Sequence, residues 1–121
     1  MASLKVRVGL CITISSLSAA CASDDPKPPF VCKVTAPTEC PSPAPTYQDV
    51  QPIIEQRCVT CHSDTSTDAW PLTSYQDVAD WCSIVRDEVL HCTMPPVDEA
   101  EPLTTEESQA ILEWVRCDCP R

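Results

Sequence analysis

Apolar positions at helical spacing mark three segments in the C-terminal two thirds of the chain. The first segment runs from about residue 49 to residue 61, the second from Ser74 to about His91, and the third from Thr104 to near Cys117. Within each segment the apolar side chains recur every three or four residues, which is the period of an amphipathic helix. Prolines and turn residues separate the three segments, so the pattern predicts a small all-α domain over residues 46–121.

Polar residues at the segment starts support these boundaries. Ser74 and Thr104 each precede an acidic residue by three positions, a spacing typical of a capping box at a helix N-terminus. In the first segment we expect Asp49 or Gln51 to cap the helix, because Pro52 then falls in the first turn, where proline is tolerated.

The first 21 residues have the pattern of a secretory signal peptide. A short basic start precedes an apolar stretch over about 8–17, and small residues lead to Cys21. The apolar stretch is too short to span a bilayer. The letters LSAAC also resemble a bacterial lipobox, in which Cys21 becomes the lipidated N-terminus, and plain cleavage near this point is the alternative. We therefore expect an exported protein, periplasmic or anchored in the bacterial envelope by lipid.

Residues 22–45 form a proline-rich segment between this leader and the predicted helices. Seven of the thirteen prolines fall in it. Such a segment is extended and packs no core, which predicts a stalk or linker. Cys32 and Cys40 interrupt this pattern, since they can close a small loop or pin the stalk to the domain.

Composition limits the partners of the chain. The net charge is −10, so nucleic acid is not an expected partner, because affinity for phosphate comes from clustered Lys and Arg. An acidic body attracts basic partners instead. Gly9 is the only glycine, which excludes the glycine-rich loops that bind phosphates and dinucleotides. Ten cysteines in 121 residues indicate an oxidising compartment.

Residues 57–63 read RCVTCHS and place the first of two histidines directly after a Cys-x-x-Cys pair. Cys-x-x-Cys-His is the attachment site of c-type haem. Two thiols that lie two residues apart on a helical turn can reach both vinyl groups of one porphyrin, and the next imidazole then lies under the iron. The motif predicts one covalent haem c on Cys58, Cys61 and His62.

Three other interpretations of the motif remain open. Cys58 and Cys61 can supply half of a zinc site, which Cys117 and Cys119 can complete to four ligands. The pair can also form a structural disulfide. A redox-active disulfide is a third interpretation, but it is expected in a βαβ context, and the helical pattern does not provide one.

A haem iron of the electron-transfer kind needs a second axial ligand. After the leader the chain has one methionine, Met94, and one further histidine, His91. Met94 precedes two prolines, and such a loop can bring its sulfur over the far face of a haem. A lone methionine is more often a core filler, but beside this motif we expect Met94 to be the ligand. His91 is the competing ligand, or it ends the second helix, where positive charge is favourable.

The body of the chain resembles a small class I cytochrome c domain, of the kind found in bacterial envelope lipoproteins. The matching stretches are QPIIEQRCVTCHS, PLTSYQDV, MPP and LTTEESQAILEWV, within residues 46–116. The resemblance implies three to four helices around one haem, with His62 and Met94 as axial ligands. The other haem-pocket residues that it implies are Leu72, Tyr75, Pro95 and Trp114.

These observations predict a monohaem electron carrier and not an enzyme, because no residue is placed as a general base in a pocket. We expect redox proteins with a basic docking face as partners, and membrane contact through the lipid anchor only. One alternative is a haem peroxidase or gas sensor with an open iron position. Another is a haem-free binding module stapled by zinc or a disulfide.

Six cysteines remain outside the leader and the motif. We expect Cys82 and Cys92 to pair with Cys117 and Cys119, which would clamp the second helix to the third. Cys32 and Cys40 are then left to pair with each other.

Overall fold

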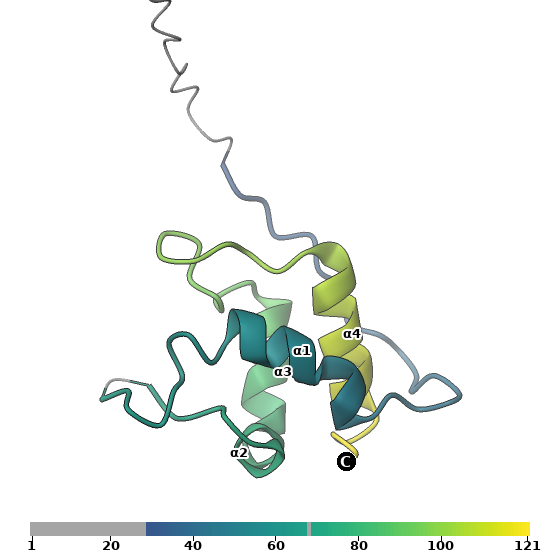
Figure 1. The fold of residues 1–121 in the computed structure, drawn as a ribbon. Helices are drawn as coiled ribbons and strands as arrows, with labels where there is room; N and C mark the ends of the chain where they lie inside the picture. The colour runs from purple at the N-terminus through teal and green to yellow at the C-terminus, as the bar shows by residue number, and fades with distance from the viewer. Residues whose placement is uncertain (1–28, 68) are drawn as a thin grey trace, which may run out of the picture.

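The computed structural model describes residues 29–67 and 69–121, and over these ranges the regular elements are four α-helices and no strand (Figure 1). They are α1 (Tyr47–Arg57), α2 (Tyr75–Asp80), α3 (Cys82–Leu90) and α4 (Thr105–Arg116). The all-α prediction is thus confirmed. None of the described helices is long and apolar enough to cross a bilayer. The predicted leader 1–21 with Cys21, and residues 22–28 of the predicted stalk, lie outside the described residues.

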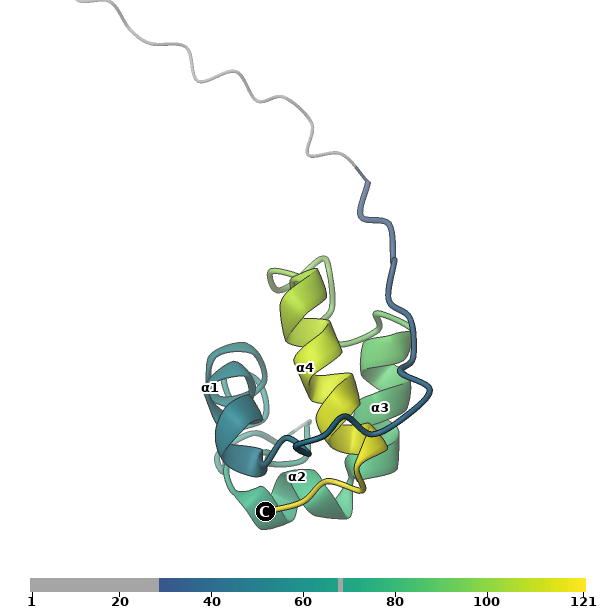
Figure 2. The ribbon, with the colours of Figure 1, turned by 90° about the vertical axis from the view of Figure 1, so that its right-hand side faces the viewer.

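Helix α4 lies between α1 and α3 and supplies four of the ten buried hydrophobic residues, more than any other helix (Figure 2). Its sequence places apolar residues on one broad face, and that face is buried against the two neighbouring helices. The side chains with under 2% of their surface exposed are Val50, Ile54, Val78, Ile111, Leu112 and Trp114. The third predicted segment therefore forms the centre of the fold.

The second predicted segment is two helices, so the expectation of one helix from Ser74 to His91 is wrong. The chain leaves helical geometry at Trp81, where φ is −107° and ψ is 17°. The turn brings the next residue, Cys82, to the C-terminal Cys119, with which it forms a disulfide. A pattern of apolar positions continues through such a break, because the residues on both sides still face the core.

Helix starts follow the predicted capping chemistry in two cases out of three. The Ser74 hydroxyl accepts from the backbone N–H of Asp77 at 3.2 Å, and Thr104 caps α4 in the same way. In α1 the prediction is wrong, because the cap is Thr46, whose backbone N–H donates to the Asp49 carboxylate at 2.7 Å. Helix α1 therefore starts two residues earlier than expected, and Pro52 lies inside it.

Two helix ends take the left-handed conformation that glycine usually provides. Cys92 follows α3 with φ at 55°, and Asp118 follows α4 with φ at 63°. After each helix, paired backbone bonds close the end: Cys92 N–H to Val89 O with Thr93 N–H to Glu88 O, and the equivalent pair from Asp118 and Cys119. In a chain without glycine here, the disulfide at Cys92 holds the first of these turns.

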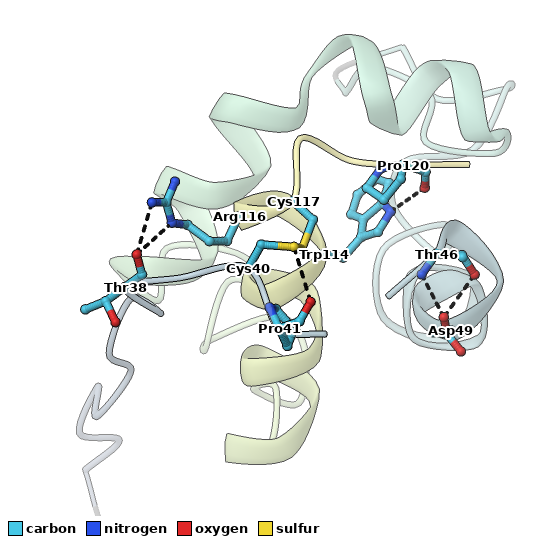
Figure 3. The surroundings of a disulfide bond; sticks show 9 residues. All are labelled: Thr38, Cys40, Pro41, Thr46, Asp49, Trp114, Arg116, Cys117 and Pro120. Atoms are coloured by element: carbon cyan, nitrogen blue, oxygen red, sulfur yellow. Dashed lines mark hydrogen bonds between the residues drawn. A yellow bond between two sulfur atoms is a disulfide. The ribbon is translucent and has the colours of Figure 1, made fainter. Parts of the chain in front are cut away.

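Three disulfides join the described cysteines, and they correct the expected pairing. Cys82 pairs with Cys119, which agrees with the predicted clamp between the second and third segments. Cys32 does not pair with Cys40. The bonds are Cys32–Cys92 and Cys40–Cys117, the latter shown in Figure 3. Both attach residues 29–45 to the helices, because cysteines far apart in sequence are close once α3 and α4 are packed.

Contacts of the chain ends complete the frame around α4. Arg116 donates from Nε and Nη2 to the carbonyl of Thr38, at 3.1 and 3.0 Å, beside the Cys40–Cys117 bond (Figure 3). The Trp114 indole donates to the carbonyl of Pro120 at 2.7 Å. The part of the predicted stalk that the structure describes therefore lies against the helices.

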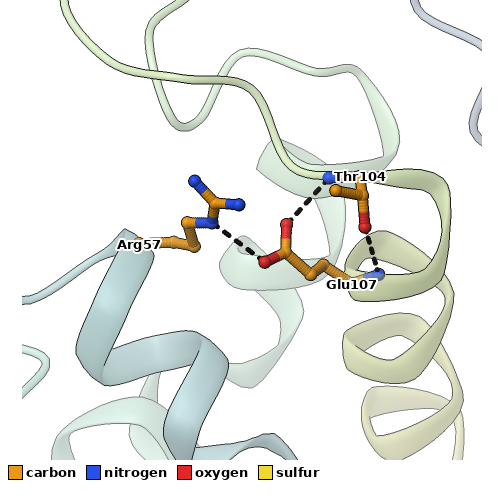
Figure 4. A network of polar contacts seen from close by, with 3 residues as sticks. All are labelled: Arg57, Thr104 and Glu107. Carbon is orange, nitrogen blue, oxygen red and sulfur yellow. Dashed lines mark hydrogen bonds and ion pairs between the residues drawn. The ribbon is translucent and has the colours of Figure 1, made fainter.

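An ion pair connects the end of α1 to the start of α4, directly before the Cys-x-x-Cys-His motif. Arg57 Nε lies 2.9 Å from Glu107 Oε1, and Glu107 Oε2 accepts from the backbone N–H of Thr104 at 2.8 Å (Figure 4). Burial opposes ionisation of Glu107, but the bonds from Thr104 and Arg57 outweigh it, so its pKa lies below the usual range. The pair ties the first residue before Cys58 to the central helix.

We expect Glu107→Gln to lower the free energy of unfolding by about 1 kcal/mol at pH 7, because glutamine keeps the cap but loses the charge. A carboxylate with a depressed pKa stabilises the folded state above its unfolded pKa, so the difference should disappear as the pH falls through the folded pKa. Urea denaturation between pH 7 and pH 3 measures this. Glu106→Gln, on the same helical turn and exposed, is the control. An equal loss in both variants at every pH would contradict the prediction.

Candidate functional site

The disulfides single out two cysteines. Of the eight cysteines in the described residues, six are bonded in pairs, and the two left as free thiols are Cys58 and Cys61. They are the cysteines of the Cys-x-x-Cys-His motif. The structure thus separates this motif from the chain's structural bridges, and the alternative of a Cys58–Cys61 disulfide is not the pairing observed.

The two thiols differ in their surroundings. Cys58 caps the C-terminus of α1, with its N–H on Ile54 O, and packs against the core, while Cys61 is exposed. Burial, and to a lesser degree the Glu107 carboxylate, raise the pKa of the Cys58 thiol to about 11. Cys58 is therefore a neutral thiol at physiological pH, and it is not an activated nucleophile or a ready thiolate ligand.

The predicted helix to residue 61 ends earlier, and this exposes the motif on a turn. Helix α1 stops at Arg57, and the N–H groups of Cys61 and His62 both donate to the carbonyl of Cys58, at 3.1 and 2.9 Å. One tight turn thus carries both thiols and the imidazole. A group that joins two thiols and an adjacent imidazole needs them gathered in this way.

His62 is oriented by the loop that follows it. Its Nδ1 lies 2.7 Å from the carbonyl oxygen of Trp70, and its own carbonyl accepts from the N–H of Leu72 at 2.9 Å. A carbonyl can only accept, so in the neutral imidazole Nδ1 carries the proton and Nε2 carries the lone pair. Ligating histidines in metalloproteins commonly use their second nitrogen in this way. His62 is therefore prepared to bind a metal through Nε2.

The loop between the motif and α2 is held closed by its own polar groups. The Thr73 hydroxyl donates to Asp64 Oδ1 at 2.8 Å, close to the Leu72–His62 bond. Leu72 itself is half-buried against the core. These bonds keep the carbonyl of Trp70 close to the imidazole.

Met94 lies on the loop after α3, and it has an exposed side chain. Its side chain is 41% exposed at the edge of a small apolar pocket, which Pro95, Val89 and Leu103 also line. Residues 58–67 and 69–74, which carry the motif, and residues 92–104, which carry Met94, leave the helices on the same side (Figure 1, left). The pocket lined by Met94 contains none of Cys58, Cys61 and His62. Axial ligation by Met94 thus stays a prediction.

The other predicted haem-pocket residues fall into two places. Tyr75 and Trp114 both contact the ring of Tyr47, with ring centroids 5.4 and 5.9 Å from it, and both donate to carbonyls near the C-terminus. Pro95 is buried beside Met94. In the ranges that the structure covers, no hydrogen bond or ring contact joins Tyr75, Trp114 or Pro95 to the motif, whereas the N–H of Leu72, the fourth predicted residue, donates to the His62 carbonyl. The roles of all four residues at a haem stay predictions.

Two residues that support His62 were not among the predicted site residues. Trp70 supplies the carbonyl, and its ring stacks on that of Trp81 with centroids 4.2 Å apart. A Trp-Pro pair that starts eight residues after His62 was the available signal for the first. No sequence pattern indicates the second, since Trp81 occupies an apolar position of its segment.

The two further cysteines that a zinc site would need are not free in this fold. Cys117 and Cys119, which would complete four ligands, are bonded to Cys40 and Cys82. Among the residues that the structure describes, no group of three or more Cys, His, Asp and Glu side chains is placed to hold a metal ion. Comparison with protein-family models, curated proteins and solved structures found no match to the chain.

Proposed function

We propose that this protein is a monohaem c-type cytochrome, with one haem attached to Cys58 and Cys61 and ligated by His62. The observation that carries the proposal is the set of free groups on one turn. All other described cysteines are bonded, and these two thiols stand beside an imidazole whose Nδ1 is already bonded to a carbonyl. This donor set fits a porphyrin with an iron at its centre.

Exposed apolar side chains provide independent support. Trp70, on the loop after the motif, is 55% exposed, and Met94 and Val97, on the loop after α3, are 41% and 40% exposed. The two loops leave the helices on the same side (Figure 1). Apolar side chains left exposed on this side are available to a large apolar group such as a haem.

The protonation state of Cys58 separates the haem proposal from a zinc site. Zinc binds the thiolate, so it must release the thiol proton, and the pKa of Cys58 near 11 opposes that release. A thioether carries no charge, so burial of Cys58 does not oppose it. The partly buried position of this residue therefore favours covalent haem over zinc.

In this proposal the residues hold and insulate one redox centre. A bound haem would supply an iron that takes up and releases one electron. His62 presents Nε2 to the iron, while Trp70 fixes the ring through Nδ1. Met94 is the proposed second ligand, which would give a relatively high reduction potential. The acidic surface, with a net charge of −10, suits a basic redox partner.

Export of the full chain from a bacterium that assembles c-type cytochromes tests the proposal. We expect the purified chain to gain the mass of one haem, which acid and organic solvent do not extract. Its reduced spectrum should show the sharp bands of a six-coordinate haem. A chain that leaves the same cells without added haem mass would refute the proposal.

Matched variants locate the attachment. Cys58→Ala with Cys61→Ala should abolish covalent haem, and Cys32→Ala with Cys92→Ala should retain it, because that pair is a structural bridge. Carbon monoxide distinguishes the open-iron alternative. Rapid binding of this gas to the wild-type reduced protein would favour a peroxidase or sensor over an electron carrier.

A further inference from the structure

Two tryptophan rings stack beside the motif and connect it to the helical frame. The rings of Trp70 and Trp81 are almost parallel, with an interplanar angle of 7° and centroids 4.2 Å apart. Trp70 is 55% exposed, so burial in the core does not explain where its ring lies. The stack on Trp81 is the ring contact that the structure gives this side chain, and offset stacking of two aromatic rings stabilises their placement beyond the area that they bury.

Trp81 is the fixed member of the pair. It lies between α2 and α3, its N–H donates to Val78 O, and its carbonyl accepts from the N–H of Val85. The next residue, Cys82, is bonded to the buried Cys119. Helix packing and a disulfide thus hold the backbone that carries this ring.

Trp70 connects the fixed ring of Trp81 to the imidazole of His62. Its carbonyl oxygen lies 2.7 Å from His62 Nδ1, so the ring and the carbonyl of one residue contact the frame and the imidazole respectively. The only other described bond from His62 to the same stretch is its carbonyl to Leu72 N–H, which does not act on the ring. The orientation of the imidazole therefore depends on where Trp70 is held.

We propose that the Trp70–Trp81 stack is a clamp that holds the Trp70 carbonyl on His62 and so keeps the imidazole in its Nδ1–H tautomer, with Nε2 free to ligate. Trp81 is a positioning residue, because it acts on His62 through Trp70, on which its ring stacks. The role of the clamp in tuning a haem rests on the proposed function. Its effect on the tautomer does not, because it concerns the chain alone.

Nitrogen NMR of the full chain without haem tests the clamp. With ¹⁵N-labelled histidine and a neutral imidazole, we expect His62 to show Nδ1 protonated and Nε2 unprotonated. Trp81→Ala should convert this signal to a mixture of both tautomers, whereas Trp81→Phe should retain most of the Nδ1–H form. Ile84→Ala is the control, since it removes an exposed apolar side chain one turn along α3.

An unchanged Nδ1–H signal in Trp81→Ala, with the three disulfides intact by mass, would overturn the proposal. If Trp81→Ala does not fold, Trp70→Leu replaces it. That substitution removes an exposed ring and keeps the backbone carbonyl, so retention of the wild-type tautomer there would overturn the proposal equally.

The haem-loaded protein gives a second readout. A hydrogen bond at Nδ1 makes the ligand more basic, and a more basic ligand stabilises oxidised iron. Trp81→Ala should therefore raise the midpoint potential, and Ile84→Ala should not. A chain that takes no haem would refute the proposed function, while the tautomer experiment would still decide on the clamp.

Discussion

Replacing Met94 with alanine is expected to lower the midpoint potential of the haem-loaded protein by at least about 100 mV, because a thioether sulfur stabilises reduced iron and axial ligands set haem potentials over a wide range. The covalent haem should remain, since Met94 takes no part in its attachment. The weak far-red band of Met-ligated ferric haem should disappear, and the reduced iron should bind carbon monoxide. Potentiometric titration with optical spectra measures all of these changes.

Met94→Ala tests axial ligation without disturbing the core, because the Met94 side chain is not among the buried core residues. It is 41% exposed, while its neighbour Pro95 is buried. His91→Ala is the matched control, because His91 is the competing ligand and its ring Nδ1 bonds to Asp87 O at 2.7 Å. A potential that falls in His91→Ala and stays unchanged in Met94→Ala would show that the histidine is the ligand.

Periodicity predicted the fold where burial is continuous along one face. The segment from Thr104 to Cys117 carries its cap, its apolar face and its end in local sequence, and α4 follows it closely. The break at Trp81 could not be predicted, because apolar residues continue on both sides of it. The cap of α1 was missed because Thr46 lies just before the apolar pattern begins, whereas the reciprocal bond comes from Asp49.

In the candidate site too, features that are local in sequence could be predicted, and features that form only in the folded chain could not. Cys58, Cys61 and His62 are adjacent in sequence, so their spacing alone indicates the chemistry. The support of His62 comes from Trp70 and Trp81, whose proximity arises only when the loop closes on the α2–α3 junction. The partners of Cys32, Cys40 and Cys92 were missed for the same reason, whereas Cys82–Cys119 agrees with the prediction. Cys32 and Cys40 are near each other in sequence, but each bonds to a partner at least 60 positions away.

Removing the bridge that anchors this junction should have the largest effect on stability. We expect Cys82→Ala with Cys119→Ala to lower the free energy of unfolding by about 4 kcal/mol, the chain-entropy value for a loop of this length. The two cysteines are 37 positions apart, and Cys119 is only 3% exposed. The total free energy of unfolding of a domain of this size is about 5–10 kcal/mol. Urea denaturation followed by tryptophan fluorescence measures the loss.

The variant with Cys32→Ala and Cys92→Ala separates two causes of that loss of stability, the gain in entropy of the unfolded chain and the loss of an anchor at the α2–α3 junction. Its cysteines are 60 positions apart, so chain entropy alone predicts that removing this bond lowers the free energy of unfolding by about 0.4 kcal/mol more than removing Cys82–Cys119 does. Cys32 is exposed on the N-terminal segment, however, whereas Cys119 is in the core beside the residues that hold Trp81. We therefore expect the Cys82–Cys119 variant to be the less stable of the two. A loss below 1 kcal/mol in that variant would mean that helix packing alone holds the junction.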